Sequence, residues 1–257
     1  MNKGFSFASV VLSYFLVAGG LLLGMLIQTK AHFESQYLLD ILLGVGAFIG
    51  GFIAARASTG STILEPAIGA VAVIASIIGS IALTSFGKMI WHIDPDGVGK
   101  GIALMGGASL AGALGGAFLS EKLFGESTQS GFPWVFYSAV AALGASFLAF
   151  VFGTIAMVNS EMPNSKETGM QILVGIAIGC FVSSIAVGAS ARVRTLFASF
   201  LGNMFGVGGL FAIIGVSQGG ADRDAIIGLV MFSVMGGIVG LIGTAIGWAM
   251  FGKKNAA

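Results

Sequence analysis

Apolar stretches of about 20 residues recur along the whole chain, separated by short polar segments. A helix of about 20 residues crosses the roughly 30 Å hydrocarbon core of a bilayer. The pattern therefore predicts an all-α integral membrane protein with eight transmembrane helices. These helices are predicted at residues 5–28, 37–57, 64–87, 101–120, 133–158, 169–191, 195–217 and 225–251.

The four prolines fit this division of the chain. Pro66 and Pro133 fall in the first turn of predicted helices, where the missing N–H costs nothing. Pro95 and Pro163 are predicted to lie in loops. No proline interrupts a predicted span.

Composition supports a membrane location. The chain is 56% hydrophobic and 9% charged, whereas soluble domains average about 25% charged residues. The first apolar stretch is longer than the h-region of a signal peptide, so we expect a retained helix. There is no Asn-x-Ser/Thr sequon, which favours a bacterial cytoplasmic membrane. A net charge of +1 indicates no surface for nucleic acid, and the lipid bilayer is the expected partner.

Charge divides the predicted loops and helix ends into two sides. One side carries seven basic and three acidic residues: Lys3, Arg56, Glu65, Glu121, Lys122, Glu126, Arg192, Arg194, Lys253 and Lys254. The other carries five basic and eight acidic residues: Lys30, Glu34, Asp40, Lys88, Asp94, Asp96, Lys100, Glu161, Lys166, Glu167, Asp222, Arg223 and Asp224. The positive-inside rule then predicts that the N- and C-termini both lie inside.

The two halves of the chain resemble each other span by span. Leu42-Leu43-Gly44-Val45 matches Leu173-Val174-Gly175-Ile176, and Ile68-Gly69 aligns with Leu201-Gly202. The order is constant and the offset changes by only a few residues. We therefore predict two tandem four-helix repeats, at residues 1–128 and 129–257. Four spans is an even number, so the repeats should have parallel orientation.

Small residues recur four positions apart in every predicted span, as at Gly20/Gly24 and Gly112/Gly116. Residues with this spacing share a helix face, which lets a neighbouring backbone approach closely. We expect such glycine-rich GxxxG packing to hold one compact bundle together. The alternatives are a narrow lumen or a surface for oligomerisation.

Two charged residues flank a short loop on the predicted inner side. Arg56 closes the second predicted helix and Glu65 opens the third. They are candidates for an interfacial ion pair that fixes the loop, and Glu65 is also well placed at a helix N-terminus.

Asn203, inside the seventh predicted span, is the most informative polar residue. An amide within the membrane must find partners in the bundle. Either Asn203 bonds a neighbouring helix, or it lines a polar pathway that Ser183 and Ser184 share. Serine can also bond its own helix carbonyls.

No catalytic motif is present: the sequence lacks a nucleophile elbow, a His-Glu-x-x-His pair and a Walker loop. His92, Asp94 and Asp96 match no EF-hand spacing and are predicted to form a solvated turn. We therefore expect a protein that is not an enzyme, with no cofactor and no metal site.

Two functions fit these observations. The chain is a small permease or channel-like facilitator for a small neutral or weakly polar solute, since span residues carry little charge. Alternatively, it is a non-catalytic membrane-embedded subunit or scaffold of a larger complex, with other membrane subunits or further copies of itself as partners.

Overall fold

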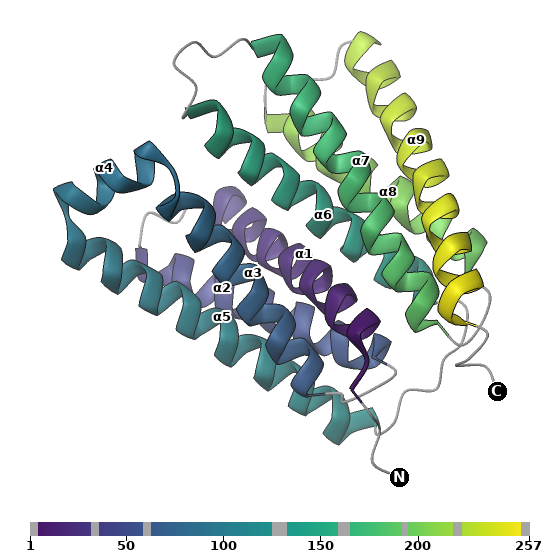
Figure 1. The fold of residues 1–257 in the computed structure, drawn as a ribbon, viewed down its shortest axis with the longest axis horizontal. Helices are drawn as coiled ribbons and strands as arrows, with labels where there is room; N and C mark the ends of the chain where they lie inside the picture. Colours follow the sequence, from purple (N-terminus) through teal and green to yellow (C-terminus); the bar gives the residue numbers. More distant parts are fainter. Residues whose placement is uncertain are drawn as a thin grey trace.

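The computed structural model describes residues 5–31, 36–58, 63–124, 133–158, 165–191, 195–217 and 223–252. Within these ranges the chain is helical and contains no strand (Figure 1). The helices are α1 (Phe7–Ala31), α2 (Gln36–Ala57), α3 (Leu64–Ala82), α4 (Ser85–Ile93), α5 (Pro95–Phe124), α6 (Pro133–Val158), α7 (Ser165–Ser190), α8 (Leu196–Ser217), α9 (Arg223–Gly247) and the π-helical turn η1 (Trp248–Gly252).

Seven of the helices are long and apolar enough to cross a membrane: α1, α2, α3, α5, α6, α7 and α9. The apolar part of α8 for which side chains are described, Leu196–Ala212, is shorter. The all-helical fold is thus confirmed for the described residues, with seven helices that could cross a membrane, while the count of eight spans stays a prediction. The loop proline Pro163 lies outside the described residues.

The predictions around residues 83–100 were wrong in detail. The third helix ends at Ala82, and a separate nine-residue helix, α4, follows it. Pro95, expected in a loop, is the first residue of α5, where proline is favoured because no intrahelical donor is lost. His92 belongs to α4 and Asp96 to α5, and Asp94 between them accepts a 2.9 Å hydrogen bond from the Gly97 N–H. The expected loop is therefore a capped junction between two helices.

The helices form two groups that meet along α1 and α6 (Figure 1). In the first group, α1 contacts α2 and α3, and both of these contact α5. In the second group, α6 contacts α7 and α8, and both of these contact α9. Each group is thus a closed ring of four long helices joined in the same order.

The central helix is α1, which packs against both groups. Leu12, Leu16, Val17 and Ala18 are all at most 1% exposed. Helix α1 is apolar all round, which is typical of a helix surrounded by other helices.

Glycines bring the helix backbones together. A Cβ atom added to Gly20 of α1 would overlap the carbonyl oxygen of Gly46 in α2, and one added to Gly46 would overlap that of Gly20. At the boundary between the groups, a Cβ on Gly144 of α6 would overlap the carbonyl oxygen of Phe15. These crossings have room only for glycine, so backbone contacts backbone directly.

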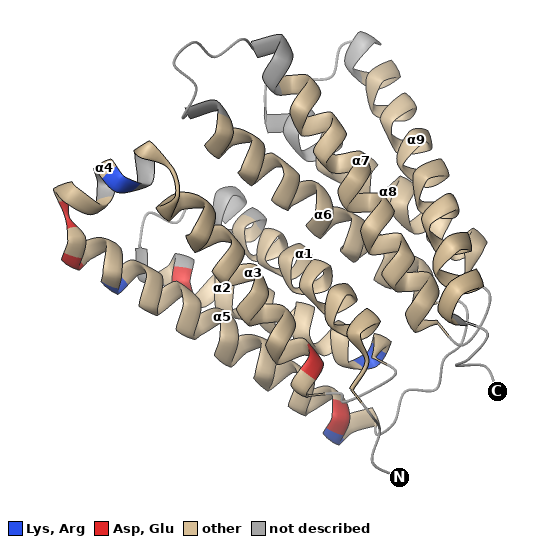
Figure 2. Cartoon of the chain, in the orientation of Figure 1, with Lys and Arg blue, Asp and Glu red and all other residues tan. Residues whose placement is uncertain are grey.

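The described charged residues of the first group gather at its two ends, and the segments between them are uncharged (Figure 2). At the end where α1 begins lie Arg56 near the end of α2, Glu65 at the start of α3, and Glu121 and Lys122 near the end of α5. The opposite end carries Asp40 near the start of α2, Lys88 in α4, and Asp94, Asp96 and Lys100 around the start of α5. An uncharged belt between two charged ends suits a protein that crosses a bilayer.

The glycine crossings make a prediction with a matched control. Gly46→Ala should lower the free energy of unfolding by about 1–3 kcal/mol, because the new methyl group forces α1 and α2 apart. Gly107→Ala should cause no loss, since a Cβ there meets no atom within 4 Å. Thermal unfolding of both variants in the same detergent checks this. Equal melting temperatures would contradict the packing described for α1 and α2.

Candidate functional site

A cluster of buried polar side chains joins three helices of the second group. Asn203 of α8 donates from Nδ2 to Ser184 Oγ of α7 at 3.0 Å. It also reaches the Ser199 carbonyl oxygen at 2.9 Å and Ser199 Oγ at 3.1 Å, one turn earlier in α8. Thr244 Oγ1 of α9 lies 2.6 Å from Ser199 Oγ and 3.2 Å from the Ser184 carbonyl oxygen. These four residues are the Asn203 cluster.

The fold excludes solvent from this cluster. Each of its four residues is at most 1% exposed. Gly240 of α9 makes the space, because a Cβ there would overlap Nδ2 of Asn203. The Ser199 carbonyl can only accept, so the amide must present its NH₂ group to it. Oδ1 then points the other way, and it has no hydrogen-bond partner among the described residues.

The structure brings together two of the three predicted pathway residues. Ser184 bonds Asn203, whereas Ser183 donates to the Cys180 carbonyl of its own helix at 3.1 Å. Ser199 and Thr244 were missed by the sequence analysis. Ser199 precedes Asn203 by four residues and so shares its face, a signal that was available. The position of Thr244 depends on how α9 packs, which the sequence pattern does not reveal.

Glu65 joins three helix ends at the end of the bundle that carries the termini. Its side chain is fully buried at the start of α3. Oε1 accepts a 2.7 Å hydrogen bond from the Ser6 N–H, just before α1. Oε2 accepts a hydrogen bond from the Ser58 hydroxyl, just after α2. A single carboxylate therefore fixes how α1, α2 and α3 meet.

Arg56 makes its described contacts elsewhere. Its guanidinium carbon lies 5.1 Å from the centre of the Phe124 ring of α5, within the range of a cation–π interaction. It also interacts with the hydroxyl of Tyr137, whose ring packs edge-on against Trp134 at 5.4 Å. Arg56 thus links the end of α2 to α5 and to the start of α6. The ion pair between Arg56 and Glu65 stays a prediction.

Both arrangements bring polar side chains of different helices together. The Asn203 cluster is closed to solvent, and Glu65 and Arg56 hold helix ends in place. Chemically, both arrangements form polar contacts between helices.

No family model, curated protein or solved structure gives a significant match to this chain.

The Asn203 cluster predicts a stability effect. Asn203→Leu should cost about 1–3 kcal/mol of unfolding free energy, because the buried hydroxyl of Ser184 loses its partner and leucine must fit against Gly240. Ser183→Ala should change stability by less than about 0.5 kcal/mol, because Ser183 bonds only its own helix. Chemical denaturation in mixed micelles would compare the two variants. A larger loss for Ser183→Ala would contradict the assignment of Ser184 as the partner.

The hydrogen bonds of Glu65 lead to a second prediction on stability. Glu65→Ala should destabilise the protein by about 1–3 kcal/mol, because the Ser6 N–H and the Ser58 hydroxyl lose their acceptor. Glu65→Gln should cost less, since its amide oxygen still accepts from Ser6 and the Ser58 hydroxyl can turn to accept from the NH₂ group. The exposed Glu121 at the same end of the bundle provides the control, Glu121→Ala. Thermal unfolding should rank the variants in that order, and a Glu65→Ala protein as stable as Glu121→Ala would refute the role of Glu65.

Proposed function

We propose that this chain is an eight-span bundle of two tandem four-helix repeats with both termini inside, in a bacterial cytoplasmic membrane. The 22 residues of α8 correspond to about 33 Å of helix, which is enough to cross the hydrocarbon core. The two ends of the described chain lie at the same end of the bundle (Figure 1), as an even number of spans requires.

The duplication is supported by how the helices pack. The ring α1–α2–α5–α3 has the same order as the ring α6–α7–α9–α8. Gly69 of α3 packs against Ser13 and Tyr14 of α1, and Gly206 of α8 packs against Ala142 and Leu143 of α6. These contacts correspond if Ser13 and Tyr14 match Ala142 and Leu143, an offset of 129 residues, whereas Gly69 and Gly202 in the sequence match differ by 133. Gly206, one turn beyond Gly202, is then the packing counterpart of Gly69.

We propose further that the protein is a non-catalytic subunit or scaffold of a larger membrane complex. The observation that carries this proposal is one face of α5. Small residues follow each other there at intervals of four, at Gly99, Ala103, Gly107 and Ala111. The last three are exposed, and a Cβ on Gly99 or Gly107 would meet no atom within 4 Å. This set of four residues is the α5 face.

The α5 face has the shape that a partner helix needs. Small residues four apart let two helix backbones approach in a membrane, where lipid provides no hydrophobic drive for association. Within this chain, glycines already allow α1 to pack directly against α2 at Gly20 and Gly46. The Asn203 cluster agrees with this role, since its four residues are buried and bond one another through Nδ2 of Asn203 and the hydroxyl groups.

One observation favours the facilitator as a second candidate. The Asn203 Oδ1 atom is buried and has no hydrogen-bond partner among the described residues. One turn away, a small apolar pocket of about 90 Å³ is lined by Cys180, Val207, Gly236 and Val239, among others. If this pocket opened toward Oδ1, a small neutral solute could pass.

Purification from native membranes in nanodiscs, with mass spectrometry, tests the proposal. We expect another membrane protein to accompany the chain in fixed stoichiometry. Gly107→Leu should reduce the recovered partner about tenfold, because the leucine holds the partner helix away from the α5 face. Gly228→Leu on α9 is the matched control, since a Cβ at Gly228 also meets nothing within 4 Å, and it should retain the partner.

Two outcomes would overturn the subunit proposal. One is a homogeneous particle without any other protein. The other is a partner that Gly107→Leu and Gly228→Leu release equally. Loss of solute flux into liposomes for Asn203→Leu, in protein that is still folded at the assay temperature, would support the facilitator in its place.

A further inference from the structure

A pocket lies beside the short helix α4, where α3 ends and α5 begins. Its volume is about 280 Å³. Residues of α4 give it a polar side, formed by Lys88, Trp91 and His92. The other sides are apolar and come from α3 and α5, with Ile81, Ala82 and Ile102 among the residues that line them. This cavity is the α4 pocket.

The three polar side chains share one face of α4. Trp91 and His92 follow Lys88 by three and four residues, a spacing that makes side chains neighbours on a helix. An ammonium group, an indole N–H and an imidazole ring therefore meet on the same side of the pocket. Each of them is a hydrogen-bond donor, and the lysine adds a full positive charge.

The described residues that line the α4 pocket include no acidic side chain. The nearest acid along the chain, Asp94, accepts a 2.9 Å hydrogen bond from the Gly97 N–H at the start of α5. No ion pair joins Lys88 to a described residue. The described lining thus offers positive charge and N–H donors, the two features that bind an anionic oxygen.

Helix α4 lies at the level where two spans end, since α3 ends at Ala82 and α5 begins at Pro95. On another face of α4, the side chains of Met89 and Ile93 are 52% and 75% exposed. A helix with one polar and one exposed apolar face suits the boundary between acyl chains and headgroups, where tryptophan is also enriched. The α4 pocket therefore lies at the depth where the phosphate of a lipid meets its acyl chains.

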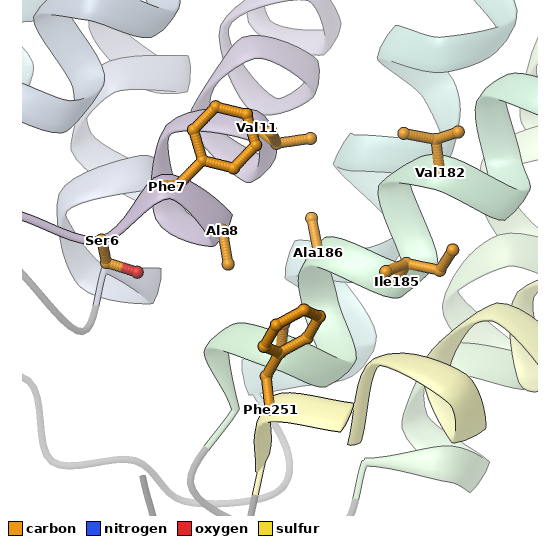
Figure 3. A pocket seen from close by; sticks show the side chains of 9 residues that line it. Ser6, Phe7, Ala8, Val11, Val182, Ile185, Ala186 and Phe251 are labelled. Carbon is orange, nitrogen blue, oxygen red and sulfur yellow. The ribbon is translucent and has the colours of Figure 1, made fainter. Parts of the chain in front are cut away.

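The groove between α1 and α7 lacks this combination (Figure 3). The described residues that line it, which include Phe7, Ile185 and Phe251, are apolar apart from Ser6. In the α4 pocket, a basic side and an apolar side lie next to each other. That arrangement favours an amphiphile with a negative head.

We propose that the α4 pocket binds one anionic phospholipid. Its phosphate lies beside Lys88, Trp91 and His92, and the first part of an acyl chain lies against Ile81 and Ile102. The volume is just below the range of about 300–1,000 Å³ typical of pockets that enclose a small ligand, so the rest of the lipid stays in the bilayer. This proposal goes beyond the proposed function and holds for a subunit and for a facilitator alike.

Native mass spectrometry of the purified, delipidated full chain tests the proposal by titration with phosphatidylglycerol or with phosphatidylcholine of the same acyl chains. We expect one phosphatidylglycerol per chain, bound about fivefold or more tightly than phosphatidylcholine, because only the former carries a net negative charge. Glycerol phosphate has the anionic group without acyl chains, so it should not displace the lipid at equal concentration. Equal affinity for the two phospholipids would overturn the proposal, as would displacement by glycerol phosphate.

A single lysine tests the headgroup contact. Lys88→Gln should weaken phosphatidylglycerol about fivefold and leave phosphatidylcholine unaffected, whereas Lys88→Arg should keep the preference. The matched control is Lys100→Gln, which removes the same charge at the same end of the bundle from a residue that does not line the pocket. It should change the affinity for phosphatidylglycerol less than twofold. Equal losses in the two glutamine variants, or no loss in Lys88→Gln, would contradict the assignment of Lys88.

The apolar side of the pocket is tested by filling it. Ala82→Phe should weaken both phospholipids about tenfold, because its ring takes the place of about two methylenes of the acyl chain. Ala156→Phe, at an exposed position of α6, should leave binding unchanged.

If Ala82→Phe does not fold, removal of the apolar wall replaces it. Ile81→Ala with Ile102→Ala should also weaken both phospholipids. The control pair is Ile226→Ala with Ile227→Ala, at exposed positions of α9. Unchanged lipid binding in the folded pocket variants would refute the α4 pocket as the lipid site.

Discussion

The structure depends on direct contact between helix backbones. Lipid tails are as apolar as leucine, so helices in a membrane gain little by burying apolar side chains against each other. The helices are instead held together by close contact between their backbones, which glycine permits because it has no side chain. The carbonyl oxygens of Gly46 and Phe15 occupy the places where side chains of Gly20 and Gly144 would otherwise lie. The first contact joins α1 to α2, and the second joins the two groups of helices.

The arrangement of polar groups follows from this close approach. Where backbones touch, there is no space for water, so the hydrogen-bond partners of a polar side chain must come from its own helix or a neighbouring one. Asn203 does so because Gly240 leaves room for its amide, and Ser184 and Ser199 supply the acceptors. At the helix ends the same requirement applies to Glu65, whose oxygens are bonded by groups next to α1 and α2.

The sequence pattern predicted the long helices well because their apolar length is a local property. Residues 133–158 are helical as predicted. It failed near Leu83 because the segments on both sides of the break are helical, so apolar content alone does not mark the end of α3. The sequence pattern also could not predict which glycines lie at helix contacts and which face outward. Gly112 packs against α2 while Gly107 faces outward, although both have small neighbours four residues away. Which face is buried depends on tertiary packing.

That distinction between faces also sets the α5 face, proposed above as a docking surface, apart from other apolar surfaces of the molecule. The α5 face is a row of small residues, and it suits a rigid helix whose own backbone can lie against it. The groove between α1 and α7 is different, because large side chains such as Phe7, Ile185 and Phe251 line it (Figure 3). Large side chains hold a second backbone away, so the close approach that glycine allows elsewhere in the bundle is not available there.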